Sequence, residues 1–90
     1  MNKQRRAEVT SIREEVETIK ESMIELKERL EAVLEEEQEI YDNTPDNLQF
    51  TERYERAGEI IETLEEAVDA FDNADSEFDT ILNDLQNAVD

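Results

Sequence analysis

The sequence predicts an all-α fold: an antiparallel two-helix coiled-coil hairpin that forms one domain over residues 1–90. Apolar residues recur at alternating spacings of three and four on both sides of Pro45, the only proline. Such a 3.5-residue repeat is typical of a helix that packs along a seam. If the chain reverses near Pro45, the two seams face each other and opposite charges meet beside them. Repeat, reversal and charge therefore agree on a hairpin.

The first repeat predicts a helix over about residues 3–41. With Val9 as position a of the heptad abcdefg, positions a and d form the expected seam, which Glu37 interrupts near its end. The seam residues are Val9, Ile12, Val16, Ile19, Met23, Leu26, Leu30, Val33 and Ile40.

The chain should turn over residues 42–51. Asn43 and Thr44 are turn and helix-capping types, and Pro45 suits the first position of a new helical turn. A short helical turn after Pro45 would tuck Leu48 and Phe50 under the tip of the hairpin.

The second repeat predicts a helix over about residues 52–89, with Gly58 inside it and Asp75 as the polar break in its seam. A lone buried carboxylate is costly, so Asp75 is expected to pair with Lys20. The seam residues are Tyr54, Ala57, Ile61, Leu64, Val68, Phe71, Phe78, Leu82, Leu85 and Val89.

The register places opposite charges together at the e positions beside the seam. The expected pairs are Lys27 with Glu65, Lys20 with Asp72, and Arg13 with Asp79.

The second helix carries a further apolar stripe at its g positions. These are Ile60, Ala67, Ala74, Ile81 and Ala88. A lone hairpin would leave the stripe wet, which favours a homodimer that forms a four-helix bundle. Two alternatives stay open: a helix of a different partner covers the stripe, or the stems of Arg and Glu side chains lie over it.

Composition excludes several function classes. Nine Lys and Arg stand against 27 Asp and Glu, a formal net charge of −18, so the chain should repel nucleic acid and anionic membranes. There is no cysteine and no histidine, and no set of residues resembles a catalytic site, so we expect no enzyme, cofactor or metal site. No apolar run reaches the roughly 18 residues of a membrane span, and cytoplasmic location is expected.

The outward faces of both predicted helices are acidic. Every charged side chain from Ala57 to Asp90 is an acid. Helices about 55 Å long with this net charge carry roughly one charge per 3 Å, and a side-by-side dimer would approach the spacing of about 1.7 Å in duplex DNA. The candidate partner-binding residues are Glu21, Glu28, Glu35, Glu55, Glu59, Glu62, Glu66, Asp69 and Glu77. The plain alternative is that the charge serves solubility.

The stretch around the turn has a distinctive sequence: EEQE over residues 36–39, YDNTPDNLQ over 41–49 and TER over 51–53. It resembles a family of small acidic proteins from phages and prophages of Gram-positive bacteria, as does the start MNKQRR. The resemblance implies a phage context in a bacterial host cell, where proteins of this kind often inhibit host enzymes or defence systems.

Together these features favour a non-enzymatic binding module. The leading hypothesis is a phage-type inhibitor that blocks a basic, nucleic-acid-binding surface of a host defence protein, with DNA mimicry as one way to do so. The alternative is a structural or adaptor coiled coil that acts through helix packing.

Overall fold

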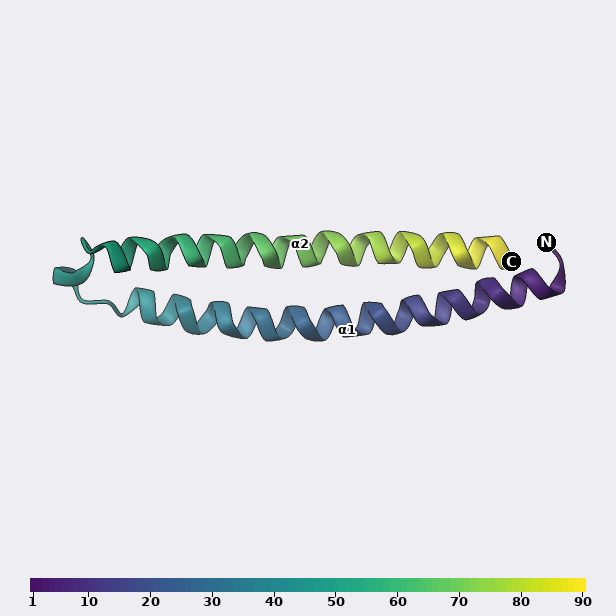
Figure 1. The fold of residues 1–90 in the computed structure, drawn as a ribbon, viewed down its shortest axis with the longest axis horizontal. Helices are drawn as coiled ribbons and strands as arrows, with labels where there is room; N and C mark the ends of the chain where they lie inside the picture. Colours follow the sequence, from purple (N-terminus) through teal and green to yellow (C-terminus); the bar gives the residue numbers. More distant parts are fainter. The chain divides into compact units, whose positions relative to one another are not determined.

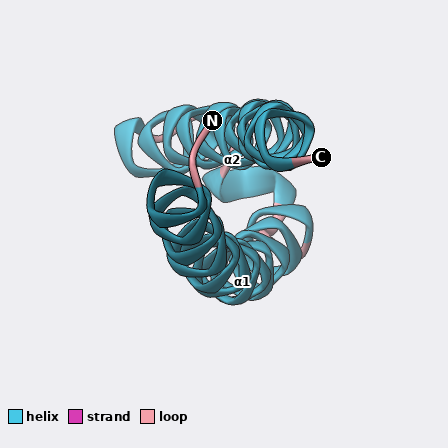
Figure 2. Ribbon diagram, turned by 90° about the vertical axis from the view of Figure 1, so that its right-hand side faces the viewer, coloured by secondary structure: helices cyan, strands magenta, loops and turns pink.

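A computed structural model describes all residues, 1–90, and contains only helices. Helix α1 spans Lys3–Asp42, the short 3-10 helix η1 spans Asp46–Leu48, and helix α2 spans Glu52–Val89. The two long helices pack against each other (Figures 1 and 2), so the all-α two-helix prediction is confirmed.

Local chemistry accounts for the helix ends. The Asn2 side-chain oxygen accepts the Arg5 backbone N–H at 2.8 Å and so caps the start of α1. At the other end the Thr44 hydroxyl donates to the Ile40 carbonyl at 3.0 Å, and Pro45, which has no N–H, follows.

The turn is held by its own backbone and by one threonine. The Leu48 N–H donates to the Pro45 carbonyl at 2.9 Å, which closes η1. The Thr51 hydroxyl accepts the Tyr54 N–H at 3.2 Å and donates to the Leu48 carbonyl at 2.8 Å, so it caps α2 and ties it to η1.

The chain divides into two compact units, each containing part of both helices. One unit comprises residues 1–25 and 71–90, and the other comprises residues 26–70, including the turn. In the first unit both chain ends lie together (Figure 1), and its most buried apolar residue is Leu82, 9% exposed. In the second unit it is Ile61, 6% exposed. No side chain in either unit is completely buried.

The seam of α1 differs from the predicted one. Its a positions are half-buried, as expected, but the other half-buried row runs along e and not along d. The half-buried e residues are Arg13, Lys20, Lys27, Leu34 and Tyr41. The predicted d residues Ile12, Ile19, Leu26, Val33 and Ile40 are all exposed. Helix α1 is thus rotated about its axis relative to the predicted a/d seam, whereas α2 uses both its a and its d positions.

Candidate functional site

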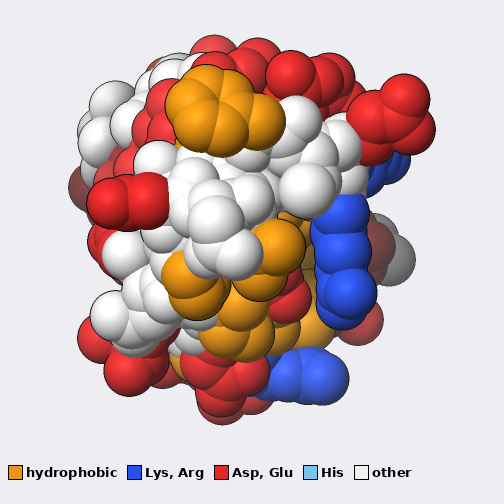
Figure 3. All heavy atoms as spheres, turned by 90° about the vertical axis from the view of Figure 1, so that its left-hand side faces the viewer, with side chains coloured by type: hydrophobic (Ala, Val, Ile, Leu, Met, Phe, Trp, Pro, Cys, Tyr) orange, Lys and Arg blue, Asp and Glu red, His pale blue; other side chains and the backbone are white.

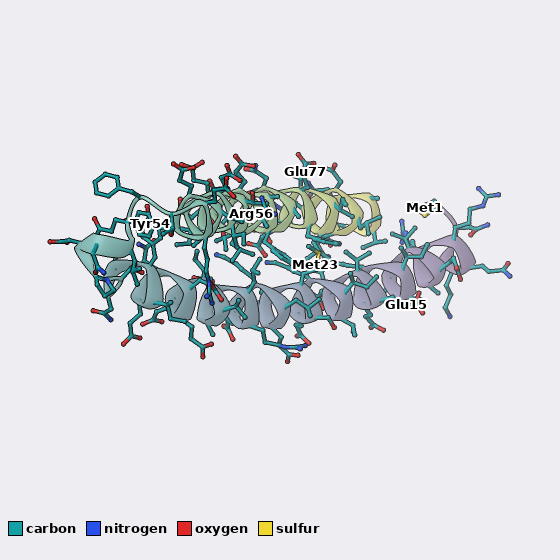
Figure 4. The ribbon with its side chains drawn as sticks, turned by 60° about the vertical axis from the view of Figure 1, so that its left-hand side comes forward. Met1, Glu15, Met23, Tyr54, Arg56 and Glu77 are labelled. Atoms are coloured by element: carbon teal, nitrogen blue, oxygen red, sulfur yellow. The ribbon has the colours of Figure 1, made fainter.

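The predicted acidic face is exposed throughout. All nine candidate residues are exposed, and Figure 4 shows Glu77 pointing away from α1. Only Glu59 among them forms an ion pair, with the Arg56 guanidinium at 3.1 Å on the same helix. The acids named for partner binding on α1, which are Glu21, Glu28 and Glu35, lie on the f row, away from the seam. The face therefore presents charges that the fold itself does not neutralise.

Basic side chains gather on the e side of α1. Lys20 Nζ donates a hydrogen bond to Asp79 and lies 3.8 Å from Asp75 Oδ1. The hydrogen bond to Asp79 is the main cause that raises the pKa of Lys20 above its ordinary value. The expected pair of Arg13 with Asp79 is wrong: Arg13 donates to Glu17 at 2.8 Å within α1, and Asp79 accepts from Lys20 instead.

Asp75 forms part of a polar layer in the unit that contains the chain ends. The expected partner Lys20 is present, but Asp75 Oδ1 is buried and accepts no hydrogen bond. Arg13 Nε is likewise buried and donates none. Unsatisfied polar atoms in a seam cost free energy of folding. This layer therefore contributes to the relative orientation of the two helices more than to the stability of the fold.

The predicted α2 stripe is partly uncovered. Ile60 is 36% exposed and Ile81 is 42% exposed, whereas the alanines between them, Ala67 and Ala74, are half-buried. Ala88 near the end of α2 is exposed. The two isoleucines therefore still present apolar surface that the rest of the chain does not cover.

A second apolar surface lies on α1. It was not expected, because the predicted a/d seam would have buried these residues. It consists of the exposed d residues, which range from Ile12 at 41% to Ile40 at 66% exposed. Leu34 and Tyr41 at e positions are the sequence signal that could have revealed it. Apolar residues at a, d and e together form an apolar face wider than packing against one helix requires.

The tip combines an aromatic stack with a shallow groove. The rings of Tyr41 and Tyr54 stack with centroids 4.3 Å apart, and Gly58 leaves room for Tyr41, whose Oη would lie 3.3 Å from a Cβ there. The stack lines a groove of about 660 Å³ with Ile40 and Leu48.

Leu48 and Phe50 do not tuck under the tip, although the sequence suggested that both would. Leu48 is 46% exposed. Phe50 is 91% exposed, because η1 ends at Leu48 and the turn that follows directs the ring outward. Figure 3 views this end of the molecule and shows apolar side chains at the surface among acidic ones.

Comparisons with protein-family models, curated proteins and solved structures found no match. No helix is long and apolar enough to span a membrane. The acidic side chains nowhere form a group of three that would hold a metal ion.

Proposed function

We propose that this chain is a non-enzymatic binding module whose acidic face binds and blocks a basic, nucleic-acid-binding surface of another protein. The proposal rests on the exposure and the lack of ion pairs of four α2 residues, which are Glu62, Glu66, Asp69 and Glu77. All four are exposed and form no ion pair, and no cation follows Ala57 on α2. Unneutralised charge on one face attracts a surface of opposite charge and accelerates association.

The charge density supports blocking of a nucleic-acid site in particular. The 38 residues of α2 extend about 57 Å at 1.5 Å per residue. The net charge of −18 over that length is roughly one charge per 3 Å, about half the density of duplex DNA, which carries one charge per about 1.7 Å, so a groove built for phosphates would meet a row of carboxylates about half as dense. The proposed setting is the cytoplasm of a bacterial host, with a phage or prophage as the source, as the sequence resemblance implies.

The test is capture of bacterial proteins on the immobilised chain, with and without Glu62→Lys, Glu66→Lys and Asp69→Lys together. Captured proteins should be released by added duplex DNA and by raising salt from about 0.1 M to 1 M, where the Debye length falls from about 10 Å to 3 Å. The triple variant should capture none of them while its circular dichroism stays helical.

The matched control reverses the same number of charges elsewhere. The control variant combines Glu8→Lys, Asp46→Lys and Asp90→Lys. All three of these residues are exposed and lie outside the acidic face. This control should retain capture. Equal capture by both triple variants would show that the location of the charges is irrelevant and would refute the proposal.

We also propose that the chain is a homodimer in which two hairpins form a four-helix bundle. The exposed Ile60 and Ile81 support this. Burial of their apolar surface against another helix would stabilise the dimer by about 25 cal/mol per Å².

The same observation favours a second candidate function, an adaptor that holds a partner by helix packing. In that case Ile60→Asp with Ile81→Asp should abolish capture of the partner, and salt should barely weaken it. Loss of capture on reversal of Glu62, Glu66 and Asp69 would exclude this candidate.

A further inference from the structure

The groove at the tip lies wholly within the unit of residues 26–70. Its volume of about 660 Å³ is that of a site for a small ligand or for a few side chains. Its apolar lining includes Ile40, which is 66% exposed, and Leu48, which is 46% exposed. Figure 3 shows apolar side chains grouped at this end of the molecule, with acidic and basic side chains around them. The chain itself therefore leaves this apolar surface open.

Glu37 brings an unpaired carboxylate to the groove. It interrupts the predicted seam, and it is one of three half-buried acids in the chain. The other two have cations nearby: Glu17 accepts from Arg13 at 2.8 Å, and Asp75 lies 3.8 Å from Lys20. Glu37 forms no hydrogen bond and no ion pair through its side chain. A carboxylate partly withdrawn from water gains from a cation, and here only a ligand can supply one.

Two other charged residues line the groove. Glu39 adds a second carboxylate and Arg53 adds a guanidinium, and both are exposed. Arg53 pairs with neither acid, so the charge of Glu37 is not neutralised from within the groove. The surrounding unit is strongly acidic, with 15 Asp and Glu against four Lys and Arg. The groove and its unit therefore both favour a cationic ligand.

The lining suits an arginine side chain better than a metal ion. The acidic side chains form no group of three that would hold a metal. Arginine combines an apolar stem with a planar guanidinium, which is weakly hydrated and so suits a half-buried carboxylate. The stem would contact the apolar lining. The rings of Tyr41 and Tyr54 also line the groove, and guanidinium groups pack favourably against aromatic rings.

We infer that the groove binds an arginine side chain of the basic partner, with the guanidinium at Glu37 and an apolar neighbour of that arginine against Ile40 and Leu48. The inference rests on the proposed function for the source of this arginine, and it adds a site that the acidic face does not contain. The acidic face attracts a basic surface over a distance. The groove distinguishes one short segment of that surface, as a buried anchor in a pocket does.

The test measures the tyrosine fluorescence of the full chain while a peptide is added. This signal reports on the groove alone, because Tyr41 and Tyr54 are the only tyrosines and there is no tryptophan. The probe is N-acetyl-leucyl-arginine amide, which has no aromatic group of its own. It should change the fluorescence in a saturable way.

Two control peptides isolate the charge and the apolar neighbour. Citrulline in place of arginine keeps the shape of the side chain and removes its charge, so this peptide should bind at least about ten-fold more weakly. Glycine in place of leucine removes the contact with Ile40 and Leu48, so this peptide should also bind more weakly than the probe.

Two variants of the chain isolate the carboxylate. Glu37→Gln removes the charge with almost no change of shape and should weaken binding of the arginine peptide at least about ten-fold. Glu36→Gln is the matched control, because Glu36 is exposed, precedes Glu37 in the chain and does not line the groove. It should bind the peptide as the wild type does. Both variants should keep the helical circular dichroism of the wild type.

Three results would overturn the inference: no saturable change in the wild type, equal binding of the probe and either control peptide, or equal effects of Glu37→Gln and Glu36→Gln. The peptide assay contains no bacterial protein, so its outcome is independent of capture by the acidic face. Peptide binding without capture would refute the proposed function and keep the groove as an arginine site. Capture without peptide binding would refute the inference alone.

Discussion

Two neighbouring residues of α1, Val33 and Leu34, test which face of the helix packs in the hairpin. Val33 at d is 46% exposed, whereas Leu34 at e is half-buried beside α2. Truncation of a buried leucine to alanine costs about 2–5 kcal/mol, and partial burial places Leu34→Ala near the lower end, about 2 kcal/mol. Val33→Ala removes a side chain that already faces water and should cost less than about 0.5 kcal/mol in the monomer.

Both variants are best compared with the wild type by urea unfolding at the same low protein concentration. With an m-value of about 1–1.5 kcal/mol per M, Leu34→Ala should lower the urea midpoint by about 1.5 M, and Val33→Ala should leave it nearly unchanged. A larger loss for Val33→Ala than for Leu34→Ala would refute the a/e seam and restore the a/d one.

Three further predictions concern the seam and its margins. Ile61→Ala should lower the free energy of unfolding by about 2–5 kcal/mol, because Ile61 is only 6% exposed; a loss below about 1 kcal/mol in urea titration would contradict the packing. The hydrogen bond to Asp79 raises the pKa of Lys20, so its stabilisation is present below pH 10.5 and lost as pH rises through the raised pKa. As the pH rises above 10.5, the urea midpoint should therefore fall less for Lys20→Met than for the wild type. An equal fall in both proteins would contradict this prediction. Gly58→Ala should gain less than the roughly 1 kcal/mol of helix propensity because its Cβ meets Tyr41, and the full gain should return in a Tyr41→Leu background, as a double-mutant cycle would measure.

The helices themselves could be predicted because their signals are local. The heptads on either side of Pro45 indicate two long helices, and Thr44 and Thr51 are capping residues that bond the backbone at the turn. Phe50 could not be placed in this way, because its exposure depends on where the turn after η1 directs one side chain.

The rotation of α1 could not be predicted from the same signals. Its apolar residues occupy a and d, but Leu34 and Tyr41 at e, and the aliphatic stems of Lys20 and Lys27, also fit against α2. A seam on a and d differs from one on a and e by a rotation of a fraction of a turn, and the better one depends on what covers the remaining row. The cations at e find carboxylates on α2, as Lys20 does with Asp79, while an apolar row at d can be covered by another chain.

The acidic face could be read from the sequence because charge needs no precise geometry. What the structure adds is which acids stay unneutralised, since the cations at e are engaged within the fold and Glu62, Glu66 and Asp69 are not paired.

Elution of bacterial DNA-binding proteins from DNA-cellulose tests the central claim, that the acidic face blocks a nucleic-acid-binding surface, most directly. A lysate is bound to the column, washed at low salt, and eluted with the wild-type chain or with the variant that combines Glu62→Lys, Glu66→Lys and Asp69→Lys. The wild type should release a defined protein in a complex that no longer binds DNA, and the variant should release none. Release of nothing by the wild type, or equal release by both chains, would contradict the claim.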